Sequence, residues 1–86
     1  MRREYVIINE QGVHARPATH LVAKANEFKS SITVTHDTTT VDMKSIMGVL
    51  SLAIHRGALI VVETKGPDEV EAMDAIDRLI KEFNMR

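Results

Sequence analysis

Residues 12–19, Gly-Val-His-Ala-Arg-Pro-Ala-Thr, carry the side chains best suited to chemistry, because a histidine stands directly before a predicted helix. The first N–H groups of a helix have no partners within it and carry partial positive charge, so an anion binds favourably there. Pro17 is tolerated at the first helical position, since its missing N–H breaks no hydrogen bond, and Arg16 adds a fixed positive charge. The spacing predicts a site that holds a phosphate on the imidazole of His14.

Histidine suits reversible phosphoryl transfer. A neutral imidazole is a nucleophile near neutral pH, because the reference pKa of histidine is about 6.5, and a phosphorylated ring nitrogen remains a good leaving group. A histidine beside a helix start is also commonly a surface residue or a cap, and the spacing alone leaves that alternative open. We expect His20 to be a surface residue near the site, and His36 and His55 to be structural or solvated. No histidine pair has the helical spacing of a metal site, and cysteine is absent, so no metal ligands are predicted.

The composition narrows the class of protein. A chain of 86 residues predicts one small domain, residues 1–86, because two would have cores too small to be stable. A net charge of −1 argues against a direct nucleic-acid binder, and Tyr5, Phe28 and Phe83 are too few to form a base-stacking platform. The sequence contains no apolar segment of the kind that predicts a signal peptide or membrane insertion. The absence of cysteine fits a cytoplasmic location.

The elements that position His14 follow from the apolar spacing. Residues 5–8 are β-branched and aromatic, which predicts a strand that leads through the loop at 9–12 to His14. Helical spacing predicts a first helix from Arg16 to about Lys29, with these apolar positions on one face: Ala18, Leu21, Val22, Ala25 and Phe28.

The second half of the chain predicts two more strands, a short helix, a strand and a final helix. Residues 31–36 alternate as a half-buried strand, and a turn at 37–39 leads to a strand through Val41. Ser45 is a good N-cap for a brief helix over 45–52, and residues 58–64 predict an interior strand. Pro67 and the acidic residues after it open a last helix, whose apolar face we expect to contain Val70, Met73, Ile76, Leu79, Ile80 and Phe83. The order is βαββαβα, which an antiparallel sheet with helices on one face satisfies.

Two segments resemble a known family. Residues 12–19 are similar to the active-site signature of HPr, the histidine-containing phosphocarrier of the bacterial sugar phosphotransferase system. Residues 44–52, Lys-Ser-Ile-Met-Gly-Val-Leu-Ser-Leu, resemble its regulatory-serine segment of the Gram-positive type. With matching length and element order, the resemblance covers essentially the whole chain and implies the HPr fold, an α+β open-faced β-sandwich with a four-stranded antiparallel sheet and three helices on one face.

The resemblance implies a carrier that is not itself an enzyme and needs no cofactor. His14 is expected to accept phosphate on Nδ1 from phosphorylated enzyme I and to donate it to the IIA domains of sugar permeases. Arg16 is expected to pair with the phosphate, and the amides from Ala15 to Ala18, except that of Pro17, to share in binding it.

Ser45 has two compatible roles. Its hydroxyl caps the short helix, and a phosphate on it would lie at the positively polarised helix end. The resemblance implies phosphorylation of Ser45 by HPr kinase/phosphorylase, with the product binding a transcription regulator of the CcpA type. So short a helix cannot bury all its sides, so we expect part of the following set to form a docking patch around His14: His20, Ile46, Met47 and Leu50.

Two positions depart from the typical carrier. Gln11 stands where carriers have serine or asparagine, and Ala53 where they commonly have glycine. The residues at both positions are similar to those of Crh, a regulatory paralogue of HPr in bacilli. Crh typically lacks the reactive histidine, whereas His14 is present here. The main prediction is a phosphocarrier with a regulatory serine. The alternatives are a Crh-like cofactor of catabolite repression that acts through phosphorylated Ser45, and an unrelated small α+β binding module.

Overall fold

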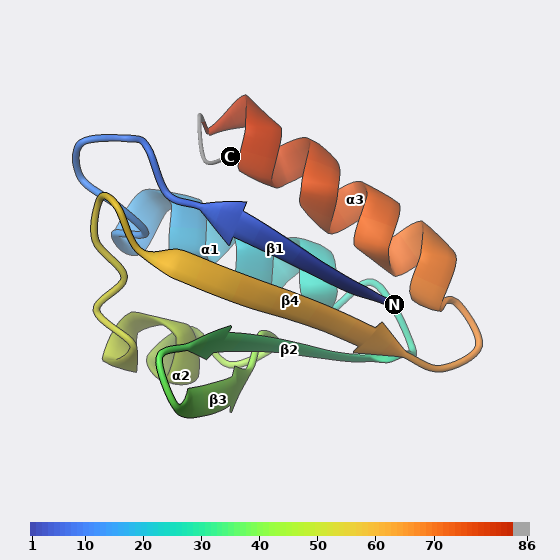
Figure 1. Cartoon of the computed structure of the whole chain (residues 1–86). Coiled ribbons are helices and arrows are strands. Elements are labelled where there is room, and N and C mark those ends of the chain that lie inside the picture. The colour runs from blue at the N-terminus through green and yellow to red at the C-terminus, as the bar shows by residue number, and fades with distance from the viewer. Residues whose placement is uncertain (84–86) are drawn as a thin grey trace.

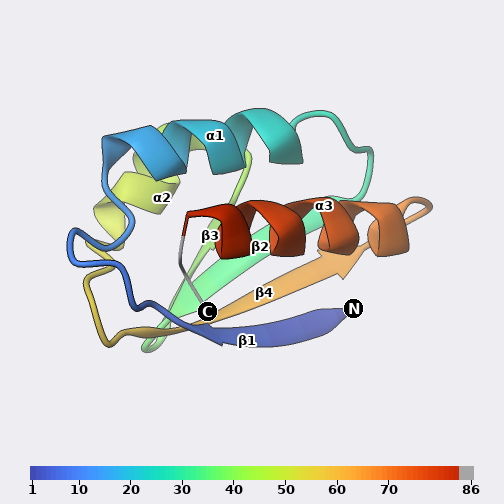
Figure 2. The same ribbon diagram turned by 90° about the horizontal axis from the view of Figure 1, so that it is seen from above.

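The computed structural model describes residues 1–83, which contain three helices and four strands. The elements in chain order are β1 (Arg2–Val6), α1 (Ala15–Ala25), β2 (Ser31–His36), β3 (Thr39–Asp42), α2 (Ile46–Ser51), β4 (Leu59–Lys65) and α3 (Glu69–Glu82). The strands form one antiparallel sheet in the order β1-β4-β2-β3. All three helices lie on the same side of it (Figures 1 and 2), so the predicted βαββαβα open-faced sandwich is confirmed.

The core lies between the sheet and the helices. Successive strand residues point to opposite faces, so every second residue of β2 and β4 is directed toward the helices. These inward residues include Ile32, Val34, Ile60 and Val62, all at most 2% exposed. From the other side, α3 contributes Met73, Ile76 and Ile80, each fully buried. Burial of such side chains stabilises the fold by about 1.5–3 kcal/mol each relative to exposure.

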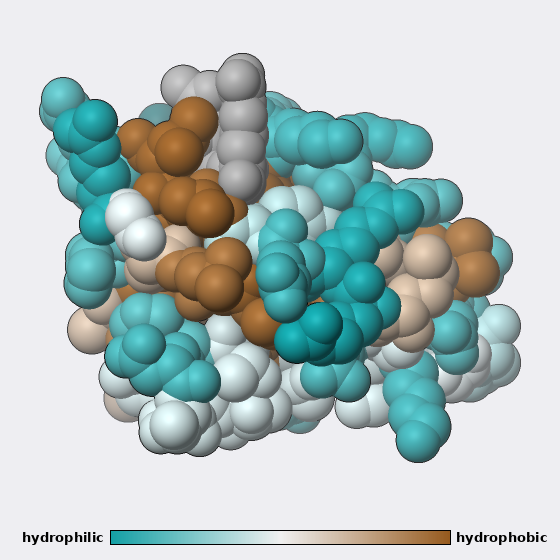
Figure 3. Space-filling view, in the orientation of Figure 1, coloured by the Kyte–Doolittle hydropathy of each residue, from teal (hydrophilic) through white to brown (hydrophobic). Residues whose placement is uncertain are grey.

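The opposite face of the sheet is open to solvent, and Figure 3 views the molecule from this side. Polar residues from neighbouring strands meet there, as in the register pair Arg2 and Glu63. A hydrophobic patch lies where β1 ends and β4 begins, and the exposed apolar side chains of these segments are Val6, Ile8 and Leu59.

The strand and helix boundaries differ from the sequence predictions. The first strand begins at Arg2 rather than at residue 5, because its polar residues pair with β4. Arg2 and Glu4 lie on the open face, whereas the Arg3 side chain reaches Asp74 and Asp77 of α3. The first helix ends at Ala25, four residues before the predicted Lys29. The Asn26 side chain ends it by donating to the carbonyls of Val22 (2.9 Å) and Lys44 (3.1 Å).

Two further expectations about local structure have clear outcomes. Val70 was predicted to face the core, but it is 51% exposed, and Ala72 is buried instead. The hairpin between β2 and β3 forms without the usual glycine. Asp37 adopts the left-handed backbone conformation there, with φ +55°, which aspartate tolerates better than most residues.

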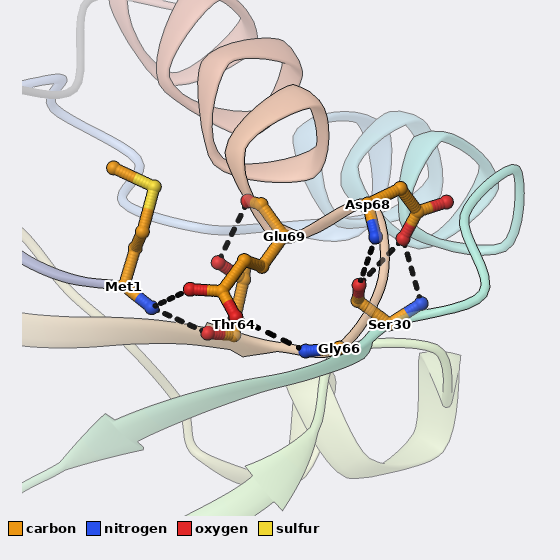
Figure 4. A network of polar contacts seen from close by, with 6 residues as sticks. All are labelled: Met1, Ser30, Thr64, Gly66, Asp68 and Glu69. Carbon is orange, nitrogen blue, oxygen red and sulfur yellow. Dashed lines mark hydrogen bonds and ion pairs between the residues drawn. The ribbon is translucent and has the colours of Figure 1, made fainter.

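The start of α3 is tied to the loop before β2 by a single carboxylate (Figure 4). Asp68 occupies the N-cap position, yet its side chain does not cap the helix. It accepts instead from the amides of Lys29 (3.0 Å) and Ser30 (2.8 Å) and from the buried hydroxyl of Ser30 (2.5 Å). The Ser30 hydroxyl and the Lys29 amide lower the pKa of Asp68 to about 2. The ionised carboxylate therefore joins two segments that are far apart in the sequence.

Replacing Asp68 with asparagine should weaken this junction, because an amide cannot accept all three hydrogen bonds as an anion does. We expect the Asp68→Asn variant to melt about 5–10 °C below the wild type at neutral pH. The pKa of Asp68 in the folded state lies below its unfolded value near 4. The wild type should therefore lose the stability that the ionised carboxylate contributes as the pH falls from about 4 to about 2, and the variant should show no such loss. Thermal melts across this pH range test it, with Glu71→Gln as the control. Equal melting temperatures for Asp68→Asn and the control at neutral pH would contradict the assignment.

Candidate functional site

His14 lies at the N-cap of α1, in an extended backbone conformation with φ −87° and ψ −171°. The helix begins at Ala15, one residue before the predicted Arg16. Pro17 therefore occupies the third position of the helix, whereas the sequence predicted proline at the first. This shift breaks no hydrogen bond, because amides throughout the first turn have no carbonyl partner within the helix. The His14 side chain is half-buried beside the positively polarised helix end.

The free amides of this helix end are fewer than expected. The Ala18 amide already donates to the His14 carbonyl at 3.0 Å, so in this arrangement it is not a free donor for a phosphate. Ala15 and Arg16 remain, since within residues 1–83 neither amide donates to a backbone carbonyl. An anion at this end therefore meets two backbone donors and the exposed Arg16 side chain.

The loop that carries His14 packs directly against the segment after α2. Gly12 has φ +64°, and a Cβ atom there would overlap the Ile54 carbonyl oxygen and lie 2.7 Å from the His55 Cα. The Val13 amide donates to the same Ile54 carbonyl at 3.0 Å. On the other side, the Asn9 side-chain amide donates to the Gly12 carbonyl at 2.7 Å. Only glycine fits at position 12, and these contacts hold the loop in place.

Two shallow hollows flank His14. One, of about 430 Å³, is lined by Asn9, Gln11, His14, Arg16, Pro17, Glu82 and Phe83. The other, of about 400 Å³, is lined by Ile8 and residues 9–11 together with His14. Asn9, Glu82 and Phe83 were not predicted at the site. For Glu82 and Phe83 the reason is that no local spacing connects the end of α3 with His14. Within the described part of the chain, no group of three or more His, Cys, Asp or Glu residues could hold a metal ion.

Ser45 caps α2, as predicted. Its hydroxyl oxygen accepts from the Gly48 amide at 3.0 Å, and its side chain lies at an exposed helix start. The apolar residues after it divide between core and surface. Met47 is 75% exposed and Leu50 is 39% exposed, whereas Ile46 packs partly against the core. The candidate docking patch on α2 is therefore formed mainly by Met47 and Leu50.

The remaining histidines have separate surroundings. His20 is exposed on α1, and its ring lies 5.3 Å from that of Phe83 at the end of α3. The rings of His36 and His55 meet edge to face, with their centroids 6.0 Å apart. His55 is exposed, and its Nδ1 lies 2.9 Å from the Arg56 carbonyl.

The same architecture occurs in solved structures of bacterial phosphocarriers. The histidine-containing phosphocarrier protein of Mycoplasma superposes with a TM-score of 0.94 at 33% identity, over 95% of this chain and 93% of that one. HPr of Thermoanaerobacter tengcongensis gives 0.91 at 38% identity, over 96% and 93%. Crh of Bacillus subtilis, a catabolite repression protein, gives 0.76 at 36% identity, over 86% and 85%.

A helix start that presents a histidine beside an open-faced sheet thus defines a class of small phosphoryl carriers. The family model for the HPr component of the phosphotransferase system, described by its phosphorylation site, matches residues 1–82. This chain belongs to the HPr family of phosphocarrier proteins. The alternative of an unrelated α+β binding module is thereby excluded. Within residues 1–83, no helix is long and apolar enough to cross a membrane.

Ala53 departs from the backbone conformation that an L-residue prefers. It follows the C-cap of α2 with φ +49°, in the left-handed region, directly before the Ile54 carbonyl that receives the Val13 amide. This conformation costs a non-glycine residue about 1–2 kcal/mol. The chain therefore bears backbone strain next to the support of the His14 loop.

Replacing Ala53 with glycine should stabilise the protein, because the relief of strain exceeds the extra entropy that glycine loses on folding. We expect Ala53→Gly to raise the free energy of unfolding by about 0.5–1 kcal/mol. The measurement is equilibrium urea denaturation. Ala23→Gly, on the exposed face of α1, is the matched control and should lower stability by a similar amount. A loss of stability in both variants would show that Ala53 bears no strain.

Proposed function

We propose that the protein carries phosphate on His14 between enzyme I and the IIA domains of sugar permeases. The observation that supports this most directly is the position of His14 at the α1 start, with the Ala15 and Arg16 amides and the Arg16 side chain beside a solvent-open hollow. A carrier must expose its phosphoryl group to two partners in turn. The shallow hollows on both sides of the ring suit that requirement. These partners would be met in the cytoplasm.

In this proposal, Arg16 stabilises the negative charge of the phosphoryl group. Its guanidinium lines the same hollow as His14 and pairs with the phosphoryl oxygens as they arrive and leave. The exposed Met47 and Leu50 on α2 and His20 on α1 supply a contact surface for the partner proteins. Exposed apolar side chains beside a reactive group are typical of docking surfaces.

The regulatory part of the proposal concerns Ser45. HPr kinase/phosphorylase would phosphorylate its exposed hydroxyl, and the phosphate would replace the hydroxyl as acceptor at the α2 start. The added dianion lies next to Met47 and so disfavours an acidic partner surface, while it gives a CcpA-type regulator a group for arginine or lysine. A purely Crh-like role is less well supported, because His14 is present together with the Ala15 and Arg16 amides and the Arg16 side chain.

The carrier role is tested by incubation with enzyme I and phosphoenolpyruvate, followed by intact-mass analysis. We expect one phosphoryl group that is labile in acid and stable in base, absent in His14→Ala and retained in the control His36→Gln. Arg16→Ala should keep the fold but transfer at least about tenfold more slowly, since it removes charge stabilisation of the moving group. Enzyme I-dependent phosphate on His14→Ala would refute the assignment.

The regulatory role is tested with protein phosphorylated on Ser45 by HPr kinase and ATP. About two added negative charges should slow transfer from enzyme I to His14 and strengthen binding to a CcpA-type regulator. Ser45→Asp should act in the same direction more weakly than phosphate, with Ser45→Ala and Ser31→Asp as controls for the lost cap and for added charge elsewhere. Unchanged transfer rates and unchanged regulator affinity in titrations would leave Ser45 as a helix cap alone.

A further inference from the structure

The C-terminal turn of α3 forms one wall of the hollow at His14. α1 and α3 run in opposite directions in the helix layer, so the end of α3 lies at the same end of the molecule as the start of α1 (Figures 1 and 2). Glu82 and Phe83 line the 430 Å³ hollow together with His14 and Arg16. The contact between the rings of Phe83 and His20, 5.3 Å apart and tilted by 54°, joins this turn to α1. An acidic side chain thus lies at the site where the proposed function requires an anion to bind.

Charge at this wall acts against the phosphoryl group. The α1 start and Arg16 attract a phosphate dianion, whereas the Glu82 carboxylate repels it from across the same hollow. The repulsion exists only when His14 carries the phosphate, so it raises the free energy of the phosphorylated form and leaves the free form unchanged.

We infer that Glu82 sets the strength of His14 as a phosphoryl donor, an inference that rests on the proposed function. On donation, the bond between the ring nitrogen and phosphorus breaks and its electron pair stays on the nitrogen. A new bond forms between phosphorus and the acceptor, which in hydrolysis is a water oxygen that gives up a proton. Glu82 takes no part in these bonds. It destabilises the loaded state and so favours passage of the group to the next acceptor.

The test loads His14 without any partner protein. Phosphoramidate transfers its phosphoryl group to the imidazole, and ammonia leaves with the imidazole proton. After the donor is removed, the lifetime of the phosphohistidine at position 14 is followed by mass analysis of the peptide that contains it, because the reagent also reaches the exposed His20 and His55. Glu82→Gln keeps the side-chain shape and removes the charge. We expect its phosphohistidine to last about threefold longer than the wild type at low salt, with the difference shrinking in 1 M salt as screening grows.

Glu71→Gln is the matched control, because it makes the same charge change in the first turn of the same helix, at the end away from His14. Its lifetime should equal that of the wild type. An unchanged lifetime in Glu82→Gln, or an equal lengthening in both variants, would overturn the inference.

A second experiment separates this inference from the proposed function. Phosphorylated wild type is mixed with unphosphorylated Glu82→Gln and a catalytic amount of enzyme I, and the equilibrium distribution of phosphate is measured. We expect the variant to hold about three times as much phosphate as the wild type, for the same electrostatic reason. An even distribution would overturn the inference and leave the carrier role intact. If enzyme I exchanged no phosphate with either protein, the carrier role would fail, and the phosphoramidate lifetimes would still decide the role of Glu82.

Discussion

The His14 site depends on the close approach of two backbone segments that are distant in the sequence. Gly12 lies against Ile54 and His55, and the Val13 amide is bonded to the Ile54 carbonyl. No side chain fits between them. Because residue 54 follows α2 closely, the helix capped by Ser45 and the loop before His14 rest on the same backbone contact. The two proposed phosphorylation positions are therefore attached to one rigid unit, although they belong to different helices.

The charges around His14 oppose one another. The α1 start and Arg16 favour an anion, and Glu82 disfavours it. A site with only the positive groups would bind phosphate firmly and release it slowly, as a storage site would. Hydrated charges interact by about 1 kcal/mol at short range, so each group shifts the balance by a modest factor. An open, shallow hollow keeps these interactions weak enough to be reversed by the next partner.

Much of the fold could be predicted from local patterns, and the site only in part. The apolar spacing of α3 and the cap at Ser45 are local features, and both were predicted correctly, apart from Val70. The early end of α1 was missed, because it depends on a hydrogen bond from Asn26 to the distant Lys44 carbonyl. Likewise, Glu82 enters the site only because two helices run antiparallel, which no spacing around His14 could indicate. Tertiary contacts decided each of these outcomes.

The sheet order determines when the molecule can form. β4 lies between β1 and β2, and its pairing joins Val6 to Leu59 across most of the chain. Within residues 1–83, the β2–β3 hairpin is the single strand pair that does not need β4. Such long-range pairing must overcome a large loop-closure entropy and slows folding. During synthesis, β1 therefore has no native strand partner until β4 has left the ribosome.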